Sequence, residues 1–165
     1  MSELDIVSGP ALERRSEIKT LGIRESVPFR TMLSNRDRLL AELIGWMTQH
    51  AVEPTGDFFL RLHVVNMAEN MEIEVGVAAS GPADDRVRAG VLPAGDYAVL
   101  AYRAKSMAAN KALHAWIQEQ GLTLDTSPHP DGEAFACRLE TYRTDPRIEP
   151  RKTKWVVELE FKVKG

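Results

Sequence analysis

The sequence predicts an α+β fold in which two pseudo-symmetric βαββ repeats form one antiparallel sheet, with the helices on one face and a central cleft. Residues 34–50 and 106–120 both have helix-period patterns, and each carries a tryptophan in its second half. Each pattern is followed by a turn, a strand pattern, a polar break and a final strand pattern. The final strands, MEIEVGV from Met71 and WVVELEF from Trp155, both alternate apolar residues with glutamates, which indicates a sheet with one covered face.

The first repeat covers about residues 12–80. Residues 1–11 are polar and interrupted by Gly9-Pro10, so we expect a flexible N-terminal tail. Residues 12–27 interleave apolar and charged residues, which is typical of a strand. In residues 34–50 the apolar side chains recur at spacings of three and four, which predicts an amphipathic helix containing Trp46. FFLRLHVV and MEIEVGVAAS then predict a hairpin.

Residues 81–96 form a connector, because glycine and proline recur there, and the second repeat covers about residues 97–165. YAVLAYRA predicts its first strand and contains Tyr102. Residues 106–120 predict a helix that carries Trp116 and ends at Gly121. EAFACRLETY and WVVELEFKVK predict the last two strands. We expect residues 12–165 to form a single domain.

Composition favours one cytoplasmic domain that does not bind nucleic acid directly. The 165 residues are 44% hydrophobic, which is enough for one core, and the formal charge is −3 without a long basic block. No signal pattern or membrane-length apolar run occurs. The single cysteine, Cys137, is interpreted as a core residue and fits a reducing compartment.

Metal, cofactor and nucleophile chemistry find little support in the sequence. The four histidines show no HxxxH or HxH spacing, and the GxSxG, GxGxxG and phosphate-loop patterns do not occur. We therefore expect neither a metal site nor a cofactor. Glu158 and Glu160, in the last strand, are interpreted as part of a solvated face.

The order of these segments resembles a known family, the gyrase-inhibitor-like small-molecule-binding domain. This module is also the effector-binding half of bacterial multidrug-responsive transcription regulators. The resemblance covers about residues 12–164 and is carried by MEIEVGV, LPAGDYAVLAYRA, AWIQEQGL, RLETYRTDP and WVVELEFKVK. One departure is Tyr102-Arg103-Ala104-Lys105, where the family often has a glycine. We expect a stand-alone form, because about 11 residues before the first strand cannot hold a helix-turn-helix.

The resemblance implies that Glu140, within RLETYRTDP, lies at the floor of a cleft lined by aromatic rings, where it meets cationic or polarised ligands. It also implies that Trp155 stacks on the ligand. Physical chemistry is consistent with both, because a carboxylate among apolar neighbours must be paired, hydrated or protonated. A lipophilic cation would supply a charge partner and attraction to ring faces.

Each candidate ligand-binding residue also has a purely structural interpretation. Glu140 could lie on a solvated face or pair with Arg138 or Arg143. Tyr142 could cap the following turn rather than bond to the carboxylate. Trp155 could be plain core. Tyr102 is a further candidate to line the cleft, whereas Trp46 and Trp116 fit core or rim packing as well as ligand contact. The candidate ligand-binding residues are therefore Glu140, Trp155, Tyr142, Tyr102, Trp116 and Trp46.

Two functions remain open. In the first, the protein binds an amphipathic, aromatic or cationic small molecule, and any regulatory action passes through an unidentified protein partner. In the second, it hydrolyses strained electrophilic cytotoxins of the cyclopropane type, as some stand-alone members of the family do, with Glu140 as general base towards water. A binding glutamate and a catalytic one look the same in a sequence.

Overall fold

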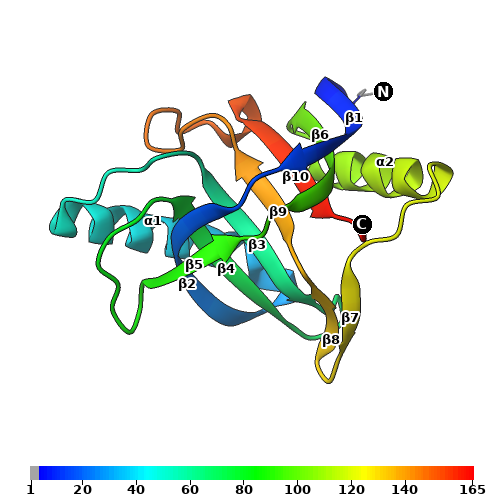
Figure 1. The fold of residues 1–165 in the computed structure, drawn as a ribbon. Coiled ribbons are helices and arrows are strands. Elements are labelled where there is room, and N and C mark those ends of the chain that lie inside the picture. The colour runs from blue at the N-terminus through cyan, green and yellow to red at the C-terminus, as the bar shows by residue number, and fades with distance from the viewer. Residues whose placement is uncertain (1–3) are drawn as a thin grey trace.

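A long antiparallel sheet organises the protein, and two helices pack on it (Figure 1). The structure is a computed structural model that describes residues 4–165. Eight strands follow one another in the order β1-β6-β10-β9-β3-β4-β2-β5, and a hairpin of β7 and β8 attaches to β3. The elements, in chain order, are β1 (Asp5–Arg15), β2 (Ile18–Pro28), η1 (Phe29–Thr31), α1 (Met32–His50), β3 (Phe58–Val65), β4 (Asn70–Ala78), β5 (Arg88–Leu92), β6 (Gly95–Arg103), α2 (Ser106–Glu119), β7 (Thr126–His129), β8 (Gly132–Phe135), β9 (Arg138–Tyr142), η2 (Lys152–Lys154) and β10 (Val156–Lys162).

The strand order confirms the predicted fold class. One unit is β2-α1-β3-β4 and the other is β6-α2-β9-β10, and the sheet places them symmetrically about the contact between β3 and β9. That contact pairs Leu60 with Glu140 and Phe59 with Thr141. The β7–β8 hairpin is inserted into the second unit alone and projects away from the sheet (Figure 1).

The larger core lies between the sheet and the helices. On α1, the buried Leu39, Leu43 and Met47 recur every four residues, as do Ala109, Leu113 and Ile117 on α2. Side chains one helical turn apart share a face, so each helix presents one apolar stripe to the sheet. The strands supply alternate residues to the same core.

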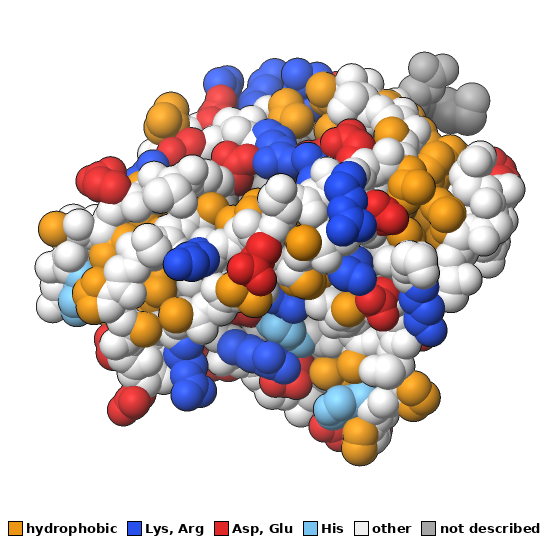
Figure 2. Space-filling model, viewed as in Figure 1, with side chains coloured by type: hydrophobic (Ala, Val, Ile, Leu, Met, Phe, Trp, Pro, Cys, Tyr) orange, Lys and Arg blue, Asp and Glu red, His pale blue; other side chains and the backbone are white. Residues whose placement is uncertain are grey.

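A smaller core covers the opposite face of the sheet. It consists of six buried residues: Phe59, Leu92, Tyr97, Val99, Cys137 and Leu139. Two chain corners cross this face, because the β1–β6 ladder ends at Arg15 and Gly95 and the β2–β5 ladder begins at Ile18 and Leu92. On the face shown in Figure 2, acidic and basic side chains are interspersed with apolar ones.

Residues 5–11 belong to a strand, which differs from the flexible tail expected over residues 1–11. β1 pairs with β6 from Asp5↔Arg103 to Arg15↔Gly95, with register shifts on either side of Ser8 (Figure 1). Residues 1–3 of the expected tail lie outside the described residues. Most β1 side chains are exposed, so backbone hydrogen bonds to β6 hold the strand in place. For the same reason, its sequence shows little of the apolar alternation by which strands are predicted.

Removing residues 2–11 should therefore destabilise the fold. The truncation exposes part of the β6 edge and removes several ladder hydrogen bonds, each contributing about 0.5–1.5 kcal/mol, so we expect a loss of about 2–5 kcal/mol in the free energy of unfolding. Urea denaturation of the full and shortened chains measures this difference. An unchanged unfolding free energy would mean that the segment behaves as a tail.

Candidate ligand-binding site around Glu140

Glu140 lies at the centre of the sheet, on the face that carries the helices. Its ladder partners are Leu60 on β3 and Leu159 on β10, and both are fully buried. The hydroxyl of Ser106, the first residue of α2, donates to Glu140 Oε1 at 3.5 Å. The carboxylate therefore lies near the N-terminus of α2, where the helix dipole favours negative charge.

Tyr142 is on the same face as Glu140 because side chains of a strand alternate. Its hydroxyl donates to Glu140 Oε2 at 3.3 Å. The Tyr142 ring also packs against that of Trp155, with centroids 5.3 Å apart and planes tilted by 58°. Trp155 is fixed in turn by a hydrogen bond from its Nε1 to the Glu149 carbonyl at 2.6 Å.

Tyr102 completes the group from β6. It is 2% exposed and lies close to the side chain of Ser106. Burial, followed by the nearby Glu140 charge, raises the pKa of Tyr102 to about 12, so its phenol stays neutral at physiological pH. Glu140 is thus accompanied on this face by two buried phenols and one indole.

Arg36 brings a guanidinium into this aromatic group. It lies in the first turns of α1 and is 8% exposed. Its carbon Cζ lies 5.7 Å from the centroid of Tyr142 and 6.0 Å from that of Trp155, which are cation–π distances. Nη1 donates to the Tyr142 hydroxyl at 3.4 Å, and Nη2 donates to Asp37 at 2.8 Å. Tyr142 is 1% exposed and Trp155 is 4% exposed, so the space beside their rings is already filled, in part by the Arg36 guanidinium.

Opposing effects act on the Glu140 carboxyl. Burial is the largest effect and raises its pKa above the ordinary value of 4.5. The charges of Arg36 and Arg138 and the hydrogen bonds from Tyr142 and Ser106 act in the opposite direction without cancelling it. The net result is a carboxyl group that holds its proton to higher pH than an exposed glutamate does.

Trp46 and Trp116 lie elsewhere. Trp46 Nε1 donates to Asp84 in the connector at 2.9 Å, and its indole stacks on His50 with centroids 4.3 Å apart. Trp116 is ten residues after Ser106 on the same helix, which corresponds to about 15 Å along the axis. The structure therefore gathers Glu140, Tyr142, Trp155 and Tyr102, and places the two helix tryptophans at the far ends of their helices.

Sequence reasoning missed Arg36 and Ser106 as site residues, whereas Arg138 was considered as a pairing partner of Glu140. A signal for Arg36 was present, because it precedes Leu39 and Leu40 by three and four positions and so shares the apolar face of the helix. Arg138 shares the face of Glu140, is 9% exposed and lies over the Phe161 ring at 4.6 Å. Ser106 was identified only as the start of a helix.

The described residues contain no candidate metal site and no candidate membrane-spanning helix. Among residues 4–165, no group of three or more His, Cys, Asp or Glu side chains is arranged to hold a metal ion. Within the same range, neither helix has the length and apolar content needed to cross a membrane.

Solved structures share this fold. The EcmrR C-terminal domain matches 93% of this chain and 96% of its own length, with a TM-score of 0.67 and 19% identity. The longer EcmrR chain in an EcmrR–DNA complex is matched over 56% of its length. SAV2435 bound to tetraphenylphosphonium matches 99% of this chain and 95% of its own, with a TM-score of 0.63 and 17% identity.

A hydrolase from Listeria innocua is a more distant match, covering 94% of this chain and 92% of its own, with a TM-score of 0.55 and 12% identity. At these identities the similarity shows a shared fold. No protein-family model matches the sequence, and no curated protein matches it either.

The raised pKa of Glu140 predicts a pH-dependent stability. A carboxyl whose pKa is higher in the folded state contributes stability at low pH, which is lost as pH rises above about 4.5 through the folded-state value. The unfolding free energy of the wild type minus that of Glu140→Gln should therefore fall as the pH is raised above about 4.5. Urea denaturation across this range measures it, with Glu119→Gln, at the exposed end of α2, as the matched control. A difference that stays constant or rises with pH would contradict this assignment.

Proposed function

We propose that the protein is a small-molecule-binding domain that takes amphipathic, aromatic cations at the Glu140 site. The observation that carries this proposal is the Arg36 guanidinium, which lies against the Tyr142 and Trp155 rings beside the Glu140 carboxylate. The site therefore already holds a cation in the arrangement that an aromatic or alkyl cation would adopt.

Ligand binding requires an exchange. Because both rings are buried under Arg36, a ligand that stacks on them must displace the guanidinium. Arg36 is close to the N-terminal end of α1 and is held by Asp37, which also pairs with Lys152. A movement of its side chain towards these exposed groups would free the rings and leave Glu140 as the charge partner of the ligand.

The fold comparisons support the proposal by analogy. SAV2435, which shares the fold, is bound to tetraphenylphosphonium, a lipophilic aromatic cation. The EcmrR C-terminal domain belongs to a chain seen in complex with DNA, which suggests how a domain of this fold could report a ligand to a transcription apparatus. For this chain, we infer a binding role whose regulatory output passes through a partner.

Tetraphenylphosphonium titration tests the proposal directly, by calorimetry and by tryptophan fluorescence. We expect saturable binding to the wild type and binding to Glu140→Gln weakened at least about tenfold, equivalent to about 1.4 kcal/mol, because the charge partner is lost. Glu119→Gln should bind as the wild type does. Arg36→Met should bind more tightly, since the competing guanidinium is gone, while Arg38→Met, on an exposed position of the same helix, should not.

Equal affinity of the wild type and Glu140→Gln, or no saturable binding to any of the five proteins, would overturn the proposal. Weaker binding by Arg36→Met would show that Arg36 supports the ligand rather than competing with it.

Hydrolysis is the second candidate, and the raised pKa of Glu140 favours it, because a general base works best when its pKa approaches the operating pH. A protein of this fold from Listeria innocua is described as a hydrolase. Incubation with an activated cyclopropane, followed by chromatography, distinguishes the two functions. A water-added product formed by the wild type and not by Glu140→Gln would identify an enzyme. Recovery of the unchanged compound would leave ligand binding as the only proposed function.

A further inference from the structure

A cavity of about 280 Å³ lies on the sheet face opposite the helices. Its floor is formed by Phe59 on β3 and by Leu139 and Thr141 on β9. Leu139 and Thr141 alternate with Glu140 and Tyr142 along the strand, so this cavity and the Glu140 site lie on opposite faces of β9. The cavity is therefore separate from the proposed binding site, and a ligand could occupy it whether or not the Glu140 site binds one.

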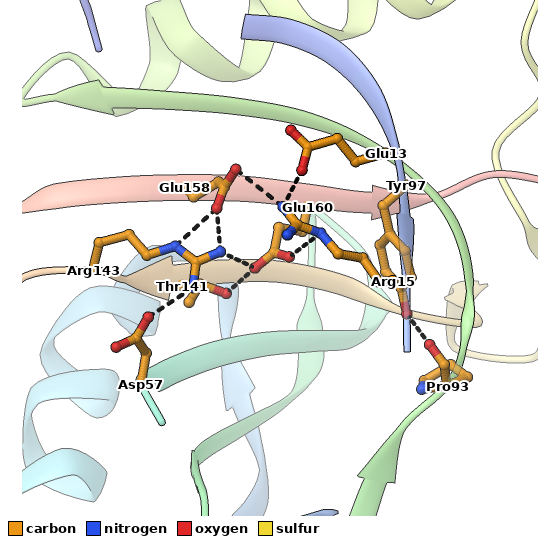
Figure 3. Close-up of polar contacts among 9 residues, drawn as sticks. All are labelled: Glu13, Arg15, Asp57, Pro93, Tyr97, Thr141, Arg143, Glu158 and Glu160. Atoms are coloured by element: carbon orange, nitrogen blue, oxygen red, sulfur yellow. Dashed lines mark hydrogen bonds and ion pairs between the residues drawn. The ribbon is translucent and has the colours of Figure 1, made fainter. Parts of the chain in front are cut away.

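The chain corners that join the two halves enclose the cavity. Arg15, Ser16 and Ile18 line it from the connection between β1 and β2, and Leu92 and Pro93 line it from the end of β5. Tyr97 also lines the cavity, and its hydroxyl donates to the Pro93 carbonyl at 2.7 Å (Figure 3). Side chains from both repeats thus meet around one space, with an apolar wall formed by Phe59, Leu92 and Leu139.

A charged network adjoins the cavity (Figure 3), and four of its members line the cavity: Arg15, Asp57, Arg143 and Glu160. Arg143 pairs with Glu158 and with Asp57, the latter at 2.7 Å, and Arg15 pairs with Glu158 at 3.2 Å and with Glu13 at 3.1 Å. Glu158 is 8% exposed and Glu160 is 7% exposed. The interpretation of these two glutamates as a solvated face was wrong, because the corners of the chain cover the face on which they lie.

Glu160 is a buried and incompletely satisfied member of this network, and the buried Nε of Arg15 beside it also has no hydrogen-bond partner among residues 4–165. It accepts one hydrogen bond within residues 4–165, from the Thr141 hydroxyl at 2.5 Å, although a carboxylate has about four acceptor positions. Its two arginine contacts are long, 3.4 Å to Arg15 and 3.6 Å to Arg143, and neither has hydrogen-bond geometry. Burial raises its pKa, and the neighbouring Glu158 charge adds to this effect. A buried carboxylate that lines a cavity with unused acceptor positions is suited to a donor from a ligand.

The charge balance indicates the sign of that ligand. The network in Figure 3 contains the carboxylates of Glu13, Asp57, Glu158 and Glu160 against the guanidiniums of Arg15 and Arg143. The four members that line the cavity, Arg15, Asp57, Arg143 and Glu160, balance in charge, and Glu13 and Glu158 behind them give the network as a whole an excess of carboxylates. An added cationic donor therefore improves the balance of the whole network, and an added anion worsens it.

We propose that this cavity binds a small aromatic cation of the amidine or primary amine class, with its ring against Phe59, Leu92 and Leu139 and its N–H groups on Glu160. The size is suitable, because a cavity of about 150 Å³ is known to hold benzene in another protein, which leaves room here for a charged substituent. Tyr97 lines the same cavity, so its ring can contact the aromatic group.

Benzamidine is the probe, and its neutral analogue benzamide is the matched ligand control. The Glu140→Gln protein is used as background, so that the probe has no carboxylate at the other site. Two-dimensional NMR of this protein should show saturable benzamidine shifts at the amides of Phe59, Tyr97 and Thr141, and benzamide should bind at least about tenfold more weakly. Adding Glu160→Gln should weaken benzamidine binding to the level of benzamide, whereas adding Glu119→Gln should change nothing.

The NMR measurement needs no substitution of Glu160, so it decides the question even if that variant does not fold. Shifts confined to Ser106 and Arg36, equal binding of benzamidine and benzamide, or no saturable shifts would each overturn the assignment. Because the probe is followed on the opposite face of β9, failure here leaves the Glu140 proposal unaffected.

Discussion

The ladder between β3 and β9 is the constraint on which the rest of the structure depends. It joins the two repeats into one sheet and fixes Glu140 opposite Leu60 at the pseudo-twofold axis. Once this register is set, alternation along β9 leaves no choice: Glu140 and Tyr142 face the helices, and Leu139 and Thr141 face the corners of the chain. A shift of one residue would exchange these sets and place an apolar leucine among the phenols and a carboxylate beside Phe59. The surroundings of Glu140 and the floor of the opposite cavity therefore both follow from one strand register.

A carboxylate at the centre of a sheet requires compensation, and the protein supplies it internally. Arg36 contributes charge, Tyr142 and Ser106 contribute hydrogen bonds, and the N-terminus of α2 contributes its dipole. Burial still dominates and raises the pKa of Glu140, so the protonation of this carboxyl group is sensitive to any charge placed beside it. The same principle operates on the other face, where Glu160 is buried among pairs that do not satisfy it fully. We propose that a bound cation would compensate the buried negative charge at both places.

Regular patterns made much of the fold predictable. The two helices, the final strands and the pairing of similar units were predicted from the spacing of apolar residues alone, because a buried face repeats at the period of its helix or strand. β1 left no such signal, since it is an edge strand whose side chains are mostly exposed. Glu158 and Glu160 alternate with apolar residues as solvated positions would, and only the chain corners, which are long-range features, bury them. Glu140 and Tyr142 could be placed on one face from the strand pattern, whereas the arrival of Arg36 from α1 depends on helix packing that the strand pattern does not encode.

The central claim is that Arg36 acts as the internal countercharge of Glu140, and a double-mutant cycle tests it most directly. The free energy of unfolding would be measured at pH 7 for the wild type, Arg36→Met, Glu140→Gln and the double variant. We expect a favourable coupling energy of about 1–3 kcal/mol, because removing either residue alone leaves the charge of the other buried without a partner. Effects that add within about 0.5 kcal/mol would contradict the claim, and Arg36 would then be a packing residue with no electrostatic connection to the site.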